Sequence, residues 1–134
     1  AGCGVQYFSQ VGAIRVAEGA GMVFDASLKL PEKLVVLQER MAAGDPLAPK
    51  VYETIGTSLG YAVAHYADFY ELKHLLILGR VTTGPGGDIM IARAQEVLAA
   101  EFPELAGRVS LALPDEKSRR VGQSIAAASL PRLR

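Results

Sequence analysis

The segment from Asp45 to Tyr70 constrains the fold of this 134-residue chain more than any other. It begins with Asp-Pro, a typical helix start, because aspartate caps the first amide groups and proline suits the first helical turn. Apolar residues then recur at helical spacing through the segment. They are Val51, Ile55, Leu59, Ala62, Val63, Tyr66 and Tyr70. The sequence therefore predicts one long helix over residues 46–70, buried along this side.

Three small residues, Gly56, Ser58 and Gly60, lie inside the predicted helix. Glycine in a helix interior costs about 1 kcal/mol relative to alanine. Such residues are tolerated where another part of the backbone must approach closely. We therefore expect this helix to be the central one of the domain and to lie on a sheet.

Shorter patterns predict the remaining elements. Two helices precede the long one, over residues 9–20 and 31–44, the second with Pro31 in its first turn. After the long helix the pattern alternates between strand and helix: a strand at 74–78, a loop at 79–88, a helix at 88–102, a strand at 109–113 and a final helix at 115–130. This alternation predicts an α/β fold with helices packed on a small, mostly parallel sheet.

Composition narrows the class of protein. A chain of 134 residues is one domain, and we treat residues 1–134 as such. Half of the residues are hydrophobic and the formal net charge is zero, which gives no support for nucleic acid or a membrane surface as partner. No apolar run approaches the roughly 18–20 residues that span a bilayer, and the sequence shows no signal peptide pattern. We expect a cytoplasmic protein.

The loop at 79–88 is the strongest candidate for a binding site. A strand that ends in glycines ahead of a helix is a common place for a phosphate or nucleotide, and also an ordinary structural turn. No Gly-Lys-Ser/Thr follows, so the loop is not a P-loop. Asp88, as the expected helix cap, would repel an anion, so neutral adenosine suits the loop better than phosphate. The candidate nucleotide-binding residues are Gly79, Arg80, Thr82, Thr83, Gly84 and Gly86.

The sequence shows no catalytic constellation. His65 and His74 have no partner at metal-ligand spacing, and no serine lies in a nucleophile motif. Cys3 is the single cysteine, which excludes an internal disulfide and a zinc site built from several cysteines. We predict no catalytic and no metal-binding residue in this chain.

Four stretches together resemble the C-terminal half of the ROK family of sugar kinases and repressors, in the actin-like ATPase superfamily. They are "CGVQYFSQVGAI", "GDPLAPKVYETIGTSLGYAVAHYADFY", "HLLILGRV" and "DEKSRRVGQSIAAASL". The resemblance implies the C-terminal lobe of a ribonuclease-H-like fold, with ATP and sugar bound between two lobes. It also implies that the N-terminal lobe, with its phosphate loop and catalytic aspartate, is missing from this sequence.

The chain departs from the family pattern at informative positions. Gly79 matches the first residue of the family's triple glycine at the adenosine site, but Arg80 replaces the second. Gln6 falls where sugar-kinase members carry the glutamate that binds a sugar hydroxyl, and an amide lacks the strength of a carboxylate hydrogen bond. The family's cysteine-rich zinc motif is absent, so no zinc is expected.

The resemblance implies the adenosine-side lobe of a ROK-like sugar kinase or ATPase, using ATP with Mg²⁺ in its complete form. The alternatives are a non-catalytic ROK-like regulator, or an interaction domain that has lost ATP chemistry. We expect this chain to be inactive alone. Because a sheet edge and an apolar face would be exposed, we also expect it to bind its N-terminal lobe or to self-associate.

Overall fold

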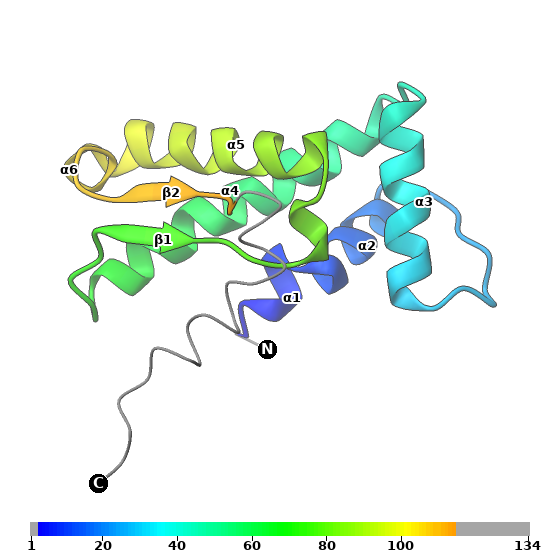
Figure 1. Ribbon diagram of the computed structural model, residues 1–134, viewed down its shortest axis with the longest axis horizontal. Coiled ribbons are helices and arrows are strands. Elements are labelled where there is room, and N and C mark those ends of the chain that lie inside the picture. Colours follow the sequence, from blue (N-terminus) through cyan, green and yellow to red (C-terminus); the bar gives the residue numbers. More distant parts are fainter. Residues whose placement is uncertain (1–2, 115–134) are drawn as a thin grey trace, which may run out of the picture.

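The computed structural model describes residues 3–114, and its elements are mostly helical (Figure 1). The predicted final helix at 115–130 lies outside the described residues. In chain order the elements are α1 (Val5–Phe8), α2 (Gln10–Gly19), α3 (Leu30–Ala42), α4 (Leu47–Ala67), β1 (His74–Leu76), the 3₁₀ helix η1 (Arg80–Thr82), α5 (Pro85–Glu101), α6 (Pro103–Ala106) and β2 (Ser110–Ala112).

The predicted long helix is confirmed as α4, and it lies in the core. The Asp45 carboxylate accepts a hydrogen bond of 2.9 Å from the Leu47 amide. The helix begins at Leu47, one residue later than predicted, so Pro46 and not Asp45 takes the capping position. Ile55 is fully buried, and Tyr66 is half-buried. Tyr70 lies beyond the end of the helix and is exposed, so the predicted helix was slightly too long. Also buried on α4 are Val51, Leu59 and Val63.

The small residues of α4 do allow a close approach, but the neighbour is helix α5. A Cβ at Gly56 would lie 2.6 Å from the Met90 carbonyl oxygen, and one at Gly60 would lie 2.8 Å from the Val97 Cβ. Both distances are shorter than side chains tolerate. The two glycines therefore pack α4 against α5, and not against the sheet as expected.

The predicted parallel pairing is confirmed. β1 and β2 form a two-stranded parallel sheet in which Leu75 lies opposite Leu111, and α5 connects the two strands. Backbone hydrogen bonds extend the pairing on both sides, from Ser110 to the Lys73 oxygen at 2.9 Å and from Ile77 to the Ala112 oxygen at 3.0 Å. The chain is thus α/β, with a small sheet and a predominance of helices.

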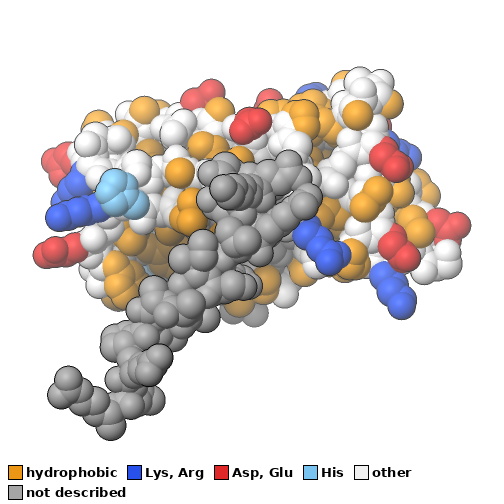
Figure 2. Space-filling view, in the orientation of Figure 1, with side chains coloured by type: hydrophobic (Ala, Val, Ile, Leu, Met, Phe, Trp, Pro, Cys, Tyr) orange, Lys and Arg blue, Asp and Glu red, His pale blue; other side chains and the backbone are white. Residues whose placement is uncertain are grey.

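The sheet carries apolar side chains on both faces. Leu111 is buried in the core, whereas Leu76 is 55% exposed. Figure 2 shows acidic and basic side chains near one another at both ends of the visible face, rather than one extended basic surface. Within residues 3–114, no helix is both long and apolar enough to cross a bilayer.

The first prediction concerns the core of α4. Truncating Ile55 to alanine leaves a cavity at a fully buried position, so it should lower the free energy of unfolding by about 2–5 kcal/mol. The exposed neighbour Glu53→Ala is the control, and it should change the free energy by less than about 0.5 kcal/mol. Chemical denaturation measures both, and equal effects would contradict the burial of Ile55.

The second prediction concerns the contact between α4 and α5. On helix propensity alone Gly56→Ala would stabilise by about 1 kcal/mol, but its methyl group meets the Met90 carbonyl, so we expect net destabilisation. Gly19→Ala in α2 is the matched control, because no atom lies within 4 Å of its Cβ position. It should be neutral or stabilising in thermal denaturation. The close approach would be refuted if both variants stabilised the protein.

Candidate functional site

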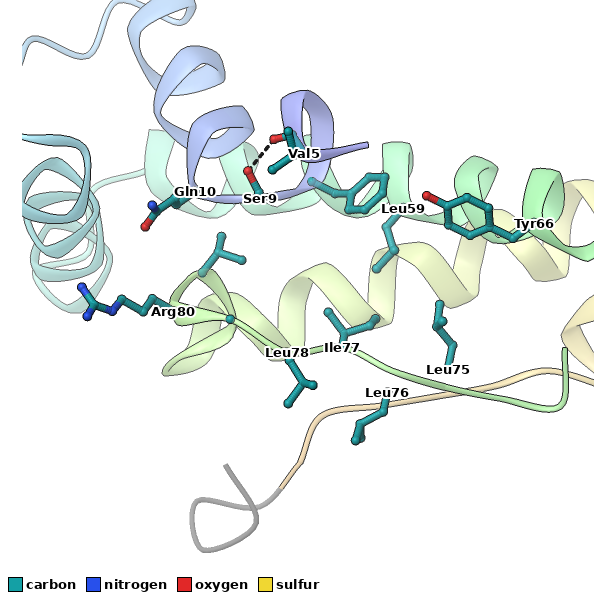
Figure 3. A pocket seen from close by; sticks show the side chains of 13 residues that line it. Val5, Ser9, Gln10, Leu59, Tyr66, Leu75, Leu76, Ile77, Leu78 and Arg80 are labelled. Atoms are coloured by element: carbon teal, nitrogen blue, oxygen red, sulfur yellow. Dashed lines mark hydrogen bonds between the residues drawn. The ribbon is translucent and has the colours of Figure 1, made fainter. Parts of the chain in front are cut away.

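A pocket of about 620 Å³ lies beside β1 and continues to the turn that follows the strand (Figure 3). Three parts of the chain form its walls: the α1–α2 junction, one side of α4, and the stretch from Leu75 to Val81. Its lining residues are Val5, Phe8, Ser9, Gln10, Leu59, Tyr66, Leu75, Leu76, Ile77, Leu78, Gly79, Arg80 and Val81.

The wall formed by β1 follows from the alternation of side chains along a strand. Leu75 and Ile77 point toward α4 and the pocket, whereas Leu76 and Leu78 point the opposite way (Figure 3). Leu76 and Leu78 are accordingly more than half exposed. Leu75 and Ile77 therefore form the apolar floor of the pocket, while Leu76 and Leu78 border it with side chains that point away.

The opposite wall depends on Ser9, which joins α1 to α2. Its hydroxyl oxygen accepts a hydrogen bond of 3.1 Å from the Val11 amide, and its hydroxyl donates to the Val5 carbonyl. This pair of bonds caps α2 and folds α1 back across the pocket (Figure 3). The residues before Ser9 form the short helix α1, and Val5 and Phe8 of this helix line the site.

The pocket has one polar end. Gln10 and Arg80 lie there, while Tyr66 lies toward the other end with the leucines (Figure 3). The Arg80 side chain is exposed, and within residues 3–114 it makes no ion pair with a carboxylate. The lining includes no carboxylate, histidine or lysine. The site therefore offers an apolar surface and one cation, without an acid or base.

Gly79 forms the turn between the apolar stretch that begins at β1 and the cation of Arg80. Its φ of +131° is a conformation that side-chain-bearing residues rarely adopt, and no atom lies within 4 Å of its Cβ position. The bare backbone therefore faces open space at the end of β1. Gly84 also has a positive φ, of +72°, and open surroundings, but it does not line the pocket.

The loop is shorter than expected, because α5 begins at Pro85. Asp88 lies in the first turn of that helix and is not its cap, so the argument that it repels an anion as a cap is wrong. Gly86 belongs to the helix as well: its Cβ would lie 2.3 Å from Cζ of Tyr52. Close packing thus accounts for this glycine without any ligand.

Only some of the six predicted nucleotide-binding residues lie at the pocket. Gly79 and Arg80 line the pocket, and the other four do not. Thr82 is buried, and its hydroxyl donates a hydrogen bond of 2.7 Å to the Gly79 oxygen, which stabilises the turn. A nucleotide contact stays a prediction for Thr82, Thr83, Gly84 and Gly86.

Gln6, the predicted sugar contact, lies outside the pocket and is engaged by Arg15. The Arg15 guanidinium donates to the Gln6 backbone oxygen at 2.7 Å and approaches its side-chain oxygen at 3.4 Å. The same guanidinium lies 5.7 Å from the centre of the Tyr7 ring. Sugar binding by Gln6 stays a prediction.

The histidines do not gather into a site. His74 Nδ1 lies 2.7 Å from the Ser110 hydroxyl, which links the two strands. His65 packs edge-on against Phe69. No group of three potential metal ligands occurs among residues 3–114.

Comparison with known proteins adds no relative. No protein-family model, curated protein or solved structure matches the chain.

Proposed function

We propose that this chain is the adenosine-side lobe of a ROK-like, actin-like ATPase whose complete form transfers phosphate from ATP to a sugar hydroxyl. One observation carries the proposal: Gly79 presents bare backbone to open space where β1 ends in an apolar pocket, next to the cation of Arg80. The four stretches that resemble the ROK family support the same reading. Such a kinase would work in the cytoplasm, where ATP is available.

The pocket suits a nucleoside in size and chemistry. Its volume of about 620 Å³ falls within the usual range for small-molecule sites, which are mostly apolar with a few polar groups. The pocket lies along β1 and continues past the carboxyl end of this strand, and in α/β proteins ligands commonly bind near the carboxyl ends of parallel strands. An adenine ring would pack on Leu75 and Ile77, and the ribose and phosphates would extend past Gly79 toward Arg80.

Catalysis would require groups from outside this pocket. Transfer of a phosphoryl group to a sugar needs a base for the hydroxyl and positive charge around the phosphates. Arg80 contributes charge, but no lining residue is able to act as the base. The resembled family places its catalytic aspartate and phosphate loop in the N-terminal lobe. Mg²⁺ would be held by the ATP phosphates together with carboxylates of that lobe.

A regulator that binds a ligand without turnover is the second candidate. The position of Gln6 favours it, because the predicted sugar contact lies outside the pocket proposed for the nucleotide. An interaction domain that has lost ATP chemistry would show the same features. ATP binding, measured directly, separates the kinase lobe from the interaction domain.

The third prediction tests the placement of the nucleotide. Gly79→Ala should weaken ATP binding about tenfold or more, equivalent to about 1.4 kcal/mol, because its methyl group enters the space proposed for the nucleoside. Gly84→Ala is the matched control: both positions have positive φ and open surroundings, but only Gly79 lines the pocket. Isothermal titration calorimetry with ATP measures both affinities.

Each outcome of this comparison has a definite meaning. A strong loss for Gly79→Ala with little change for Gly84→Ala supports the pocket. Equal losses would show that backbone strain, or a wider loop site, determines the affinity, and would refute the pocket as the nucleoside site. No ATP binding by the unchanged chain would refute the kinase-lobe proposal.

The fourth prediction concerns activity and association. Within residues 3–114 β1 has a partner strand on one side only, and Leu76 and Leu78 are exposed. We propose that the N-terminal lobe, or a second copy of the chain, covers this region. The purified 134-residue chain should release no ADP above background with any sugar, and it should be larger than a monomer in solution.

Both properties are measured on one sample, by a coupled ADP assay and by light scattering. A monomer that turns over ATP would contradict both parts of the prediction. A monomer without turnover would contradict association alone. An oligomer that turns over ATP would contradict the predicted inactivity. It would show that the 134-residue chain contains a catalytic base outside the pocket lining.

A further inference from the structure

The turn that contains Arg80 is held by a side chain from a distant helix. Nε2 of Gln38, on α3, lies 3.2 Å from the Arg80 carbonyl oxygen and 3.3 Å from the Thr83 carbonyl oxygen. These two carbonyls bracket the 3₁₀ helix η1. A glutamine amide carries two N–H donors, so one side chain is able to hold both ends of the turn.

A buried hydroxyl lies beside this contact. The Tyr52 side chain is fully buried, and within the described part of the chain its hydroxyl has no hydrogen-bond partner of good geometry. Burial raises the pKa of Tyr52, while the neighbouring Gln38 side chain acts in the opposite direction. An unpaired buried hydroxyl is costly, and the Gln38 side chain is the polar group that lies beside it.

Helix α5 confines the same turn from its other side. A Cβ at Gly87 would lie 2.3 Å from the Thr82 carbonyl oxygen, and one at Gly86 would overlap the Tyr52 ring. The start of α5 is therefore in contact with η1 and with Tyr52. Gln38 holds the side of the turn that faces α3 through two hydrogen bonds at the long end of the accepted range.

We propose that Gln38 is a positioning residue that fixes the turn from Arg80 to Thr83, and so presents Gly79 and Arg80 to the ligand. The effect of Gln38 on ATP affinity rests on the proposed function. Its hydrogen bonds to the turn do not depend on that proposal. Gln38 does not line the pocket, so it acts through the loop and not by touching a nucleotide. Through this residue, a displacement of α3 would be transmitted to the proposed nucleotide site.

The test removes the donors and keeps the shape. Gln38→Met preserves the length of the side chain but donates no hydrogen bond, and Gln38→Lys restores a donor of similar length. Glu39→Gln is the control, because this neighbour on α3 is exposed. Hydrogen exchange is measured at the amides of Thr82 and Thr83, which donate to the oxygens of Gly79 and Arg80 at 3.1 and 3.2 Å.

We expect exchange at these two amides to be about fivefold to tenfold faster in Gln38→Met, as befits the loss of one or two modest hydrogen bonds. Gln38→Lys and Glu39→Gln should exchange like the unchanged chain, and amides within α4 should not change in any variant. Equal exchange at Thr82 and Thr83 in Gln38→Met would overturn the proposal. So would faster exchange throughout the protein, because that indicates general destabilisation.

ATP titration of the same variants separates the two proposals. If the unchanged chain binds ATP, Gln38→Met should bind it several-fold more weakly, and unaltered affinity would refute the positioning role. If the unchanged chain does not bind ATP, the proposed function fails, while the exchange measurement still decides whether Gln38 holds the turn.

Discussion

The close packing of α4 on α5 is the constraint on which the rest of the structure depends. Gly56 and Gly60 let the backbone of α5 approach α4 more closely than any side chain would permit. Because α5 connects β1 to β2, its position on α4 also determines where the parallel strands lie. The positions of the sheet and of the pocket beside it therefore depend on the two glycines of α4, which have no side chain.

Glycine has two different roles in the candidate site. At Gly86 and Gly87 the backbone is helical, and the absence of a side chain lets α5 begin against Tyr52 and the Thr82 carbonyl. At Gly79 the surroundings are open, and the requirement is conformational. A glycine with free space around it and its backbone at a pocket is the feature that favours a ligand, and among residues 3–114 only Gly79 combines both.

The sequence predicted the elements whose pattern is long and regular, and it missed those that depend on contacts. The period of Val51, Ile55 and Leu59 identified α4 because burial along one side of a helix leaves a repeating trace. Residues 85–87 were assigned to the loop because glycine disfavours helices, although proline suits a first helical turn. The structure starts α5 at Pro85, and Gly86 packs there against Tyr52. For the site, the pattern identified Gly79 and Arg80. It missed Phe8, Gln10 and the role of Gln38, because single polar or aromatic residues in short segments carry no period.

The apolar run of β1 has a consequence beyond the pocket. Leu75 and Ile77 face α4, but Leu76 and Leu78 are apolar as well and more than half exposed. A strand that is hydrophobic at every position is typical of parallel sheets covered on both faces. In a strand with one solvent-exposed face, apolar and polar residues alternate. The helices described here cover one face only. The sequence of β1 therefore fits a layer with a second cover. A further layer on this face, from residues outside 3–114 or from another copy of the chain, would satisfy this requirement.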